Sequence, residues 1–190
     1  EGHKCYEVPI GGASPVGSVG FIEGFTELME QAEQMFGKEP DYLFHATGSG
    51  GTMAGLLAGR ALKGAKVPVI SINVSMKDDG YPKRCAALAN ESLKVLGIEP
   101  MVEQERDVRT DLNYYHPGYE IPSESASKAI RLLAETEGLF VDPVYTGKAF
   151  AGMLDYIRTG KVEPGSNVVF LHTGGATALF AEKEILGKLF

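Results

Sequence analysis

A five-residue segment, Gly48-Ser49-Gly50-Gly51-Thr52, has the composition of an anion-binding loop. It follows an apolar run at residues 42–46 and precedes residues 52–62, whose apolar spacing is that of a helix. Glycine lets a ligand approach the backbone closely, and successive N–H groups in such a loop converge at the positive N-terminus of the helix. The loop therefore predicts a phosphate site.

Two common nucleotide-binding motifs do not fit this loop. A dinucleotide fingerprint requires a third glycine where the chain has Met53, and residues 71–73, about 20 positions later, lack the expected acidic side chain. A Walker A loop requires a lysine, and none occurs between Lys38 and Lys63. The residues favour a monophosphate bound without a metal ion. The alternative is that the glycines only close a tight turn between a strand and a helix.

Strand and helix patterns alternate along the chain. The expected strands are residues 5–9, 42–46, 67–74, 100–104, 139–141 and 167–172. The expected helices are residues 17–36, 52–62, 82–96, 123–137 and 147–159, with Ser123 as an N-cap, and a last helix after residue 175. This order predicts an α/β fold with a parallel twisted sheet and helices on both faces, in three layers. Loops 47–52, 145–147 and 173–175 would then lie together beyond the carboxyl ends of the strands.

Composition restricts the class of partner and the compartment. The net charge of −7 and a pI near 5.2 argue against nucleic-acid binding, which requires a basic face. No apolar run approaches the roughly 20 residues of a membrane span, and no signal peptide is visible. Cys5 and Cys85 form no disulfide framework, and the four histidines lack metal-ligand spacing. We expect a cytoplasmic protein without a metal ion.

Further segments resemble one known family. They are Ile10-Gly11-Gly12-Ala13-Ser14-Pro15-Val16-Gly17, Ala46-Thr47 with the glycine loop, Gly118-Tyr119, Asp142-Pro143-Val144-Tyr145-Thr146-Gly147-Lys148 and His172-Thr173-Gly174-Gly175. Their order and separations are similar to those of the D-cysteine desulfhydrase / 1-aminocyclopropane-1-carboxylate deaminase family. The resemblance covers essentially the whole chain. It implies a pyridoxal 5'-phosphate cofactor, the tryptophan-synthase-β fold type (fold type II), a small amino-acid substrate and a homodimer.

The resemblance also implies that a further segment exists. In this family a lysine in an N-terminal segment, which also contains a small domain, binds the cofactor aldehyde. No part of the present sequence matches that segment. We therefore expect residues 1–190 to form the cofactor-binding portion of the large domain and to be inactive alone.

The resemblance assigns roles to individual residues. The cofactor-binding residues would be Thr47, Gly48, Ser49, Gly50, Gly51, Thr52, Thr146, Thr173 and Gly174. The active-site tyrosines would be Tyr119 and Tyr145, which could hold a substrate carboxylate or amine, or move a proton. Tyrosines at strand ends can instead serve only packing. Within the same motifs, Lys148 is interpreted as structural and His172 as a buried histidine with satisfied hydrogen bonds.

Thr146 and Thr173 bear on the substrate. Deaminases of the family carry Glu and Leu at the matching positions, so threonine at both resembles the desulfhydrase pattern. A neutral hydroxyl near the ring nitrogen suits β-elimination of D-cysteine to pyruvate, sulfide and ammonia. Alternatives are L-cysteate sulfo-lyase and the cyclopropane deaminase reaction. An alternative of another class is a non-catalytic phosphate-binding domain.

Overall fold

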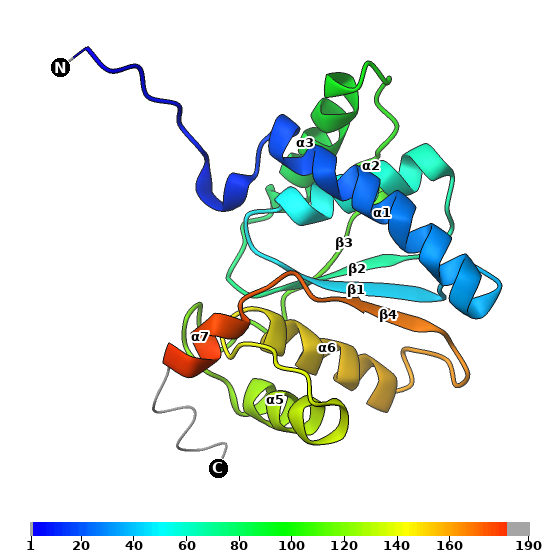
Figure 1. Ribbon diagram of the computed structural model, residues 1–190, viewed down its shortest axis with the longest axis vertical. Helices are drawn as coiled ribbons and strands as arrows, with labels where there is room; N and C mark the ends of the chain where they lie inside the picture. The colour runs from blue at the N-terminus through cyan, green and yellow to red at the C-terminus, as the bar shows by residue number, and fades with distance from the viewer. Residues whose placement is uncertain (1, 182–190) are drawn as a thin grey trace.

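The computed structural model describes residues 2–181, and within them four parallel strands form one sheet (Figure 1). The strands are β1 (Tyr42–Thr47), β2 (Val69–Asn73), β3 (Arg109–Asp111) and β4 (Val168–Leu171), in the order β3-β2-β1-β4. Leu43 of β1 pairs with Val69 of β2 and with Val169 of β4. Because the strands are parallel, their carboxyl ends share one edge of the sheet.

Helices cover both faces of this sheet. They are α1 (Pro15–Phe36), α2 (Gly51–Lys63), α3 (Tyr81–Val95), α4 (Gln104–Asp107), α5 (Glu124–Glu137), α6 (Thr146–Arg158) and α7 (Ala176–Ala181), with a 3-10 turn, η1, at Ile10–Gly12. Helices α1, α2 and α3 lie on one face, and α5 and α6 on the other (Figure 1). The predicted three-layer α/β fold is therefore confirmed. No described helix is long and apolar enough to cross a membrane.

Local sequence signals explain where the long helices begin and end. Ser14 caps α1 by accepting a hydrogen bond from the Gly17 N–H at 3.0 Å, and Pro15 occupies the first helical position. Ser123 caps α5 as predicted, since its hydroxyl accepts from the Ala126 N–H. Gly138 ends α5 in the left-handed conformation. These signals lie in the sequence itself, which is why the helices were predictable.

Three expected strands are wrong. Residues 5–9 are exposed and pair with no strand, and residues 139–141 form no strand either. Residues 100–104 contain no strand because the Asn90 side chain of α3 binds their backbone. Its Oδ1 accepts from the N–H groups of Met101 and Val102, and its Nδ2 donates to the Val102 carbonyl. The strand forms later, at Arg109–Asp111, where no strand was expected.

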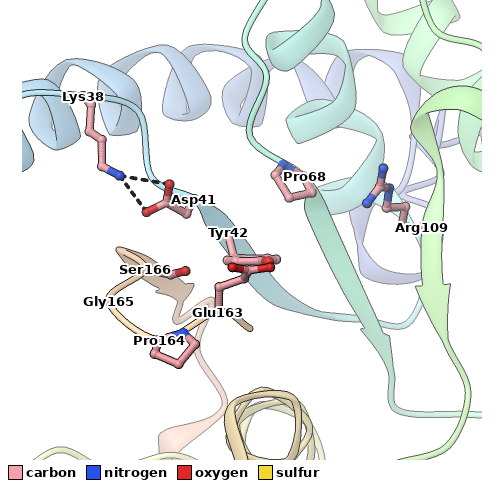
Figure 2. A pocket seen from close by; sticks show the side chains of 9 residues that line it. All are labelled: Lys38, Asp41, Tyr42, Pro68, Arg109, Glu163, Pro164, Gly165 and Ser166. Carbon is pink, nitrogen blue, oxygen red and sulfur yellow. Dashed lines mark hydrogen bonds and ion pairs between the residues drawn. The ribbon is translucent and has the colours of Figure 1, made fainter. Parts of the chain in front are cut away.

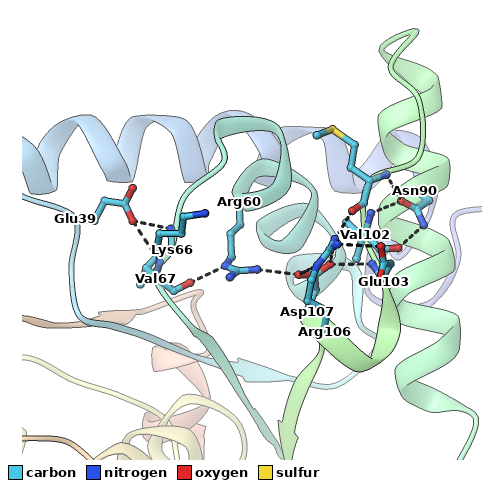
Figure 3. Close-up of polar contacts among 10 residues, drawn as sticks. Glu39, Arg60, Lys66, Val67, Asn90, Val102, Glu103, Arg106 and Asp107 are labelled. Atoms are coloured by element: carbon cyan, nitrogen blue, oxygen red, sulfur yellow. Dashed lines mark hydrogen bonds and ion pairs between the residues drawn. The ribbon is translucent and has the colours of Figure 1, made fainter.

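A partly buried ion pair fixes the approach to β3. Arg60 of α2 donates from Nε to the Val67 carbonyl at 2.8 Å and from Nη1 to Asp107 at 3.0 Å. Arg106 binds the same carboxylate, as Figure 3 shows. Burial alone would raise the pKa of Asp107, but these hydrogen bonds and charges outweigh it and hold that pKa below its usual value. The cluster joins the loop before β3 to α2, and so anchors that side of the sheet.

Candidate cofactor-binding site

The glycine loop connects β1 to α2 at the carboxyl edge of the sheet. Gly50 is the N-cap of α2 and has a φ of 97°, which favours glycine. A Cβ at this position would lie 2.8 Å from the Cys85 sulfur. No side chain caps α2, so the N–H groups of its first turn keep their capacity to bind an anion. The backbone at the start of α2 is therefore compatible with the predicted phosphate site, which stays a prediction.

The N-terminal turn η1 packs directly against this loop. A Cβ on Gly11 would overlap the Ser49 hydroxyl, and a Cβ on Gly51 would lie 3.1 Å from the Cα of Ala13. Residues 10–13 and the glycine loop, which are far apart in sequence, therefore lie in contact. The resemblance included residues 10–17, yet it gave Gly11 and Ala13 no role.

Tyr81 fixes the start of the loop from the side of α3. Its hydroxyl lies 2.8 Å from the Thr47 hydroxyl and donates to the Gly48 carbonyl at 3.2 Å. Burial is the main cause that raises the pKa of Tyr81, so the phenol is neutral at physiological pH. Sequence patterns did not single out Tyr81, because it lies 34 residues from its partner.

Tyr145 lies at the same edge of the sheet, as predicted. Its hydroxyl donates to the Ala46 carbonyl at 3.0 Å, and a Cβ on Gly48 would lie 3.7 Å from its ring. Burial raises the pKa of Tyr145, the Thr173 hydroxyl opposes that shift, and nearby Tyr119 adds to it. Tyr119 is 54% exposed. The two predicted tyrosines thus differ in exposure, since Tyr145 is half-buried and Tyr119 is open to solvent.

The two threonines have different surroundings. Thr146 is fully buried, and its hydroxyl lies 2.7 Å from Asp142 Oδ1 and 3.1 Å from the Gly174 carbonyl. The Thr173 hydroxyl is buried without a hydrogen bond of normal geometry in the described residues. An unpartnered buried hydroxyl costs free energy, and it is the group that a bound ligand would satisfy. The structure therefore distinguishes Thr173 from Thr146.

Asp142 organises the turn before α6. Its carboxylate accepts from the N–H groups of Val144, Tyr145 and Thr146, at 2.8, 2.6 and 2.6 Å respectively, as well as from the Thr146 hydroxyl. The carboxylate also lies where a side chain on Gly175 would stand. The motif contained Asp142 without a role. Its position three and four residues before the helical N–H groups was the available signal.

Lys148 and His172 were both expected to be structural. Lys148 is fully buried and donates to two backbone carbonyls, which agrees with that expectation. His172 is exposed, so the expected burial is wrong. Its Nε2 bonds the Phe140 carbonyl at 2.8 Å, and its Nδ1 accepts from the Gly174 N–H, so its hydrogen bonds are satisfied at the surface. The buried histidine is instead His45, in β1.

A polar pocket at the opposite edge of the sheet differs from this site. It lies where β1 begins, beside Tyr42, and Figure 2 shows Lys38 directed toward Asp41. Those two side chains form an ion pair with a distance of 2.9 Å. Asp41 also accepts from the Asn167 N–H, so its carboxylate already has partners within the protein. In residues 2–181 no group of three His, Cys, Asp or Glu side chains could hold a metal ion.

Known relatives of this chain are lyases that use amino-acid substrates. The chain is 39% identical over 181 residues to the 1-aminocyclopropane-1-carboxylate deaminase of Burkholderia cenocepacia. The alignment covers 95% of this chain and 53% of the relative. It is 34% identical over 187 residues to the D-cysteine desulfhydrase of Salmonella typhi, with the same coverage. The chain thus spans about half the length of the curated relatives it matches.

Solved structures agree with these relatives. The crystal structure of an ACC deaminase homologue superposes with a TM-score of 0.83 at 32% identity, over 100% of this chain and 55% of that one. The L-serine ammonia-lyase of Rhizomucor miehei shares the fold alone, with a TM-score of 0.53 at 18% identity over 90% of this chain and 56% of that one. Fold type II is therefore confirmed.

The model of one enzyme family matches residues 2–174. Its description is "Pyridoxal-phosphate dependent enzyme", and the match includes the glycine loop, both tyrosines and both threonines of the site. The chain therefore belongs to the family of pyridoxal-phosphate-dependent enzymes.

Proposed function

We propose that these residues are the cofactor-binding portion of the large domain in a lyase that eliminates sulfide from D-cysteine. One observation carries the proposal: the uncapped N-terminus of α2 shares an edge of the sheet with Tyr145 and with the unpartnered Thr173 hydroxyl. An anion site beside a buried, unused hydroxyl has the parts needed for a phosphorylated ring. A homodimer and a cytoplasmic location stay predictions from the resemblance.

The residues present fit pyridoxal phosphate. The N–H groups of residues 48–52 would hold the phosphate, with hydroxyls from Ser49 and Thr52, while Thr47 shapes the loop through Tyr81. The Thr173 hydroxyl would hold the ring nitrogen, and Gly174 would shape the backbone around it. When bound, the cofactor supplies an electron sink for the bond that breaks at the substrate α-carbon.

The tyrosines would act on the substrate. Tyr145 donates its proton to the Ala46 carbonyl, so its oxygen keeps lone pairs that can accept a hydrogen bond from an ammonium group. Its raised pKa keeps the phenol neutral, so it would orient the substrate rather than act as a base. Tyr119, exposed at the mouth of the site, would hold the substrate carboxylate or move a proton.

D-cysteine is favoured over the cyclopropane substrate by the absence of a free carboxylate beside Thr173 in the described residues. The acid that approaches this loop, at Gly175, is Asp142, and the backbone and hydroxyl of the turn before α6 already occupy its oxygens. A neutral partner such as the Thr173 hydroxyl would leave the ring nitrogen of bound pyridoxal phosphate uncharged and its electron sink weaker. That suffices when sulfide is the leaving group: D-cysteine and water give pyruvate, ammonia and hydrogen sulfide. L-cysteate, which would release sulfite, fits the same site.

The test uses the full-length protein that contains this sequence, incubated with pyridoxal phosphate and each of the three substrates. We expect sulfide and pyruvate from D-cysteine, and no ammonia from 1-aminocyclopropane-1-carboxylate. The variant Thr173→Val, which keeps the shape and loses the hydroxyl, should lower turnover, whereas Thr136→Val on the outer surface of α5 should not. Cofactor binding without turnover of any substrate would favour a non-catalytic phosphate-binding role. We expect no turnover from the 190-residue chain alone.

A further inference from the structure

Lys148 is a buried cation that binds carbonyl oxygens. It lies in the first turn of α6 with 0% of its surface exposed. Its Nζ donates to the Tyr115 carbonyl at 2.9 Å and to the Gly118 carbonyl at 2.6 Å. No ion pair of Lys148 is found in residues 2–181. Burying an ammonium group is costly unless hydrogen bonds compensate for the lost water, so these two contacts are what retain it.

The two carbonyls belong to one turn, and that turn precedes Tyr119. Its other contacts are modest: the rings of Tyr115 and His116 stack at 4.2 Å, and the Ile121 N–H reaches the Gly118 carbonyl at 3.4 Å. His116 itself is exposed. The short bonds from Lys148 therefore connect residues 115–118 themselves to α6, while Tyr114, directly before them, donates to Asp155 of the same helix at 2.8 Å.

Lys148 also shares a helical turn with Tyr145. The two residues are three positions apart at the start of α6, so that one turn of helix carries a site tyrosine and the ammonium that binds the opposite loop. Tyr119 directly follows Gly118, whose carbonyl Lys148 binds, so the ammonium fixes the backbone one residue before this tyrosine. Helix α6, which begins after Tyr145, thus also restrains the position of Tyr119 through Lys148.

We propose that Lys148 is a positioning residue, which holds the turn of residues 115–118 so that Tyr119 stays beside Tyr145. The inference rests on the proposed function for the role of Tyr119, but not for the contacts themselves. The contacts of the ammonium in the described residues are with the backbone of this turn. It acts through the two carbonyls, and its removal should release the loop without altering the phosphate-binding loop.

The experiment compares Lys148→Met, Tyr119→Phe and the double variant in the full-length, cofactor-loaded protein, with Lys128→Met as the matched control. Lys128 is exposed on α5 and pairs only with Glu124 in the described residues. The first readout is hydrogen exchange of residues 115–121, which needs no substrate. We expect faster exchange in Lys148→Met, unchanged exchange in Lys128→Met, and unchanged cofactor absorbance in both.

The second readout is kinetic. Because Lys148 acts through Tyr119, the double variant should lose kcat/KM to within about twofold of the worse single variant, rather than as the product of both losses. Unchanged exchange in Lys148→Met, or losses that multiply, would overturn the proposal. If the wild-type protein turns over none of the three substrates, the proposed function fails, while the exchange result still decides the role of Lys148.

A folding defect is controlled by a second variant. If Lys148→Met is insoluble, the same exchange measurement is made on Lys148→Gln, which keeps an N–H donor and loses the charge. Faster exchange limited to residues 115–121 supports the proposal. Insolubility of both variants contradicts it, because the proposal assigns Lys148 to one turn and not to the stability of the whole fold.

Discussion

The hydroxyls of Tyr81 and Thr47 lie 2.8 Å apart and connect the first turn of α3 to the last residue of β1. Tyr81 also reaches the Gly48 carbonyl, so a single side chain bonds the residues on both sides of the junction between strand and loop. The loop thus has a side-chain support that lies outside the glycine motif.

Replacing Tyr81 by Phe should weaken cofactor binding. The change keeps the ring and removes both hydrogen bonds, which leaves Thr47 without its buried partner. A loss of about 1 kcal/mol in binding free energy corresponds to roughly a fivefold rise in the Kd for pyridoxal phosphate. Titration of the full-length protein with pyridoxal phosphate, followed by absorbance, measures it. Tyr6→Phe, at an exposed tyrosine, is the control; equal affinities of the two variants would contradict a supporting role for Tyr81.

Gly50→Ala should destabilise the protein. A φ of 97° disfavours any residue with a Cβ, at about 1–2 kcal/mol, and the new methyl group would also displace the Cys85 sulfur. Gly20→Ala is the matched control, because Gly20 is exposed inside α1 and, apart from its chain neighbours and the adjacent backbone of α1, no atom lies within 4 Å of the place that its new methyl group would take. The free energy of unfolding of that control variant should rise by about 0.5–1 kcal/mol. Urea denaturation of both variants measures the difference, and a shift of the same sign in both would refute the argument.

Stability should fall with acid because of His45. Its Nδ1 donates to the Ala46 carbonyl, and in the neutral ring that burial favours, its Nε2 then accepts from the Ser71 hydroxyl. Burial lowers the pKa of His45 from 6.5 to about 4. Between these values the unfolded chain binds a proton that the folded chain does not, so the unfolding free energy decreases by about 1.4 kcal/mol per pH unit as the pH falls.

Urea denaturation between about pH 7 and pH 4.5 tests this dependence on His45. His45→Gln should lower stability at pH 7 and flatten the slope in that window. His3→Gln, at an exposed position, should change neither. An unchanged slope in His45→Gln would assign the acid sensitivity to other groups.

Asp142→Asn should loosen the start of α6. The amide cannot accept in the same way at both atoms, so at least one of the N–H groups of residues 144–146 loses a charge-assisted hydrogen bond. The free energy of unfolding should therefore fall by about 1.5–3 kcal/mol. Thermal unfolding measures it, with Asp79→Asn at an exposed aspartate as the control. A melting temperature equal to that of the control would show that Asp142 contributes no more than a surface charge.

Much of the fold could be predicted because its signals are local. The apolar runs at residues 42–46 and 67–74 became β1 and β2, and Ser123 capped α5 as expected. The strand expected at residues 100–104 failed for a reason that is not local: a single Asn90 side chain, 11 residues before Met101, binds the backbone there. No periodicity in the segment itself reports that contact.

The candidate site, like the fold, was predictable where its signals are local in the sequence. The glycine loop follows from composition, and the position of Tyr145 follows from the order of motifs. The support from Tyr81 and the burial of Lys148 depend on contacts across 34 and 33 residues, which spacing alone cannot reveal. His172 was expected inside because it follows an apolar strand. The chain instead turns outward there, and the ring bonds Phe140 at the surface.

The contact of turn η1 with the glycine loop has a thermodynamic consequence. Gly11 meets Ser49, and Ala13 meets Gly51, so the N-terminal turn supports the loop in the shape seen here. For an anion that binds only the supported loop, folding of residues 10–13 and occupation of the site would be linked equilibria, in which each favours the other by the same free energy. This N-terminal turn, which contains no predicted ligand-binding side chain, would then contribute to affinity because it is ordered.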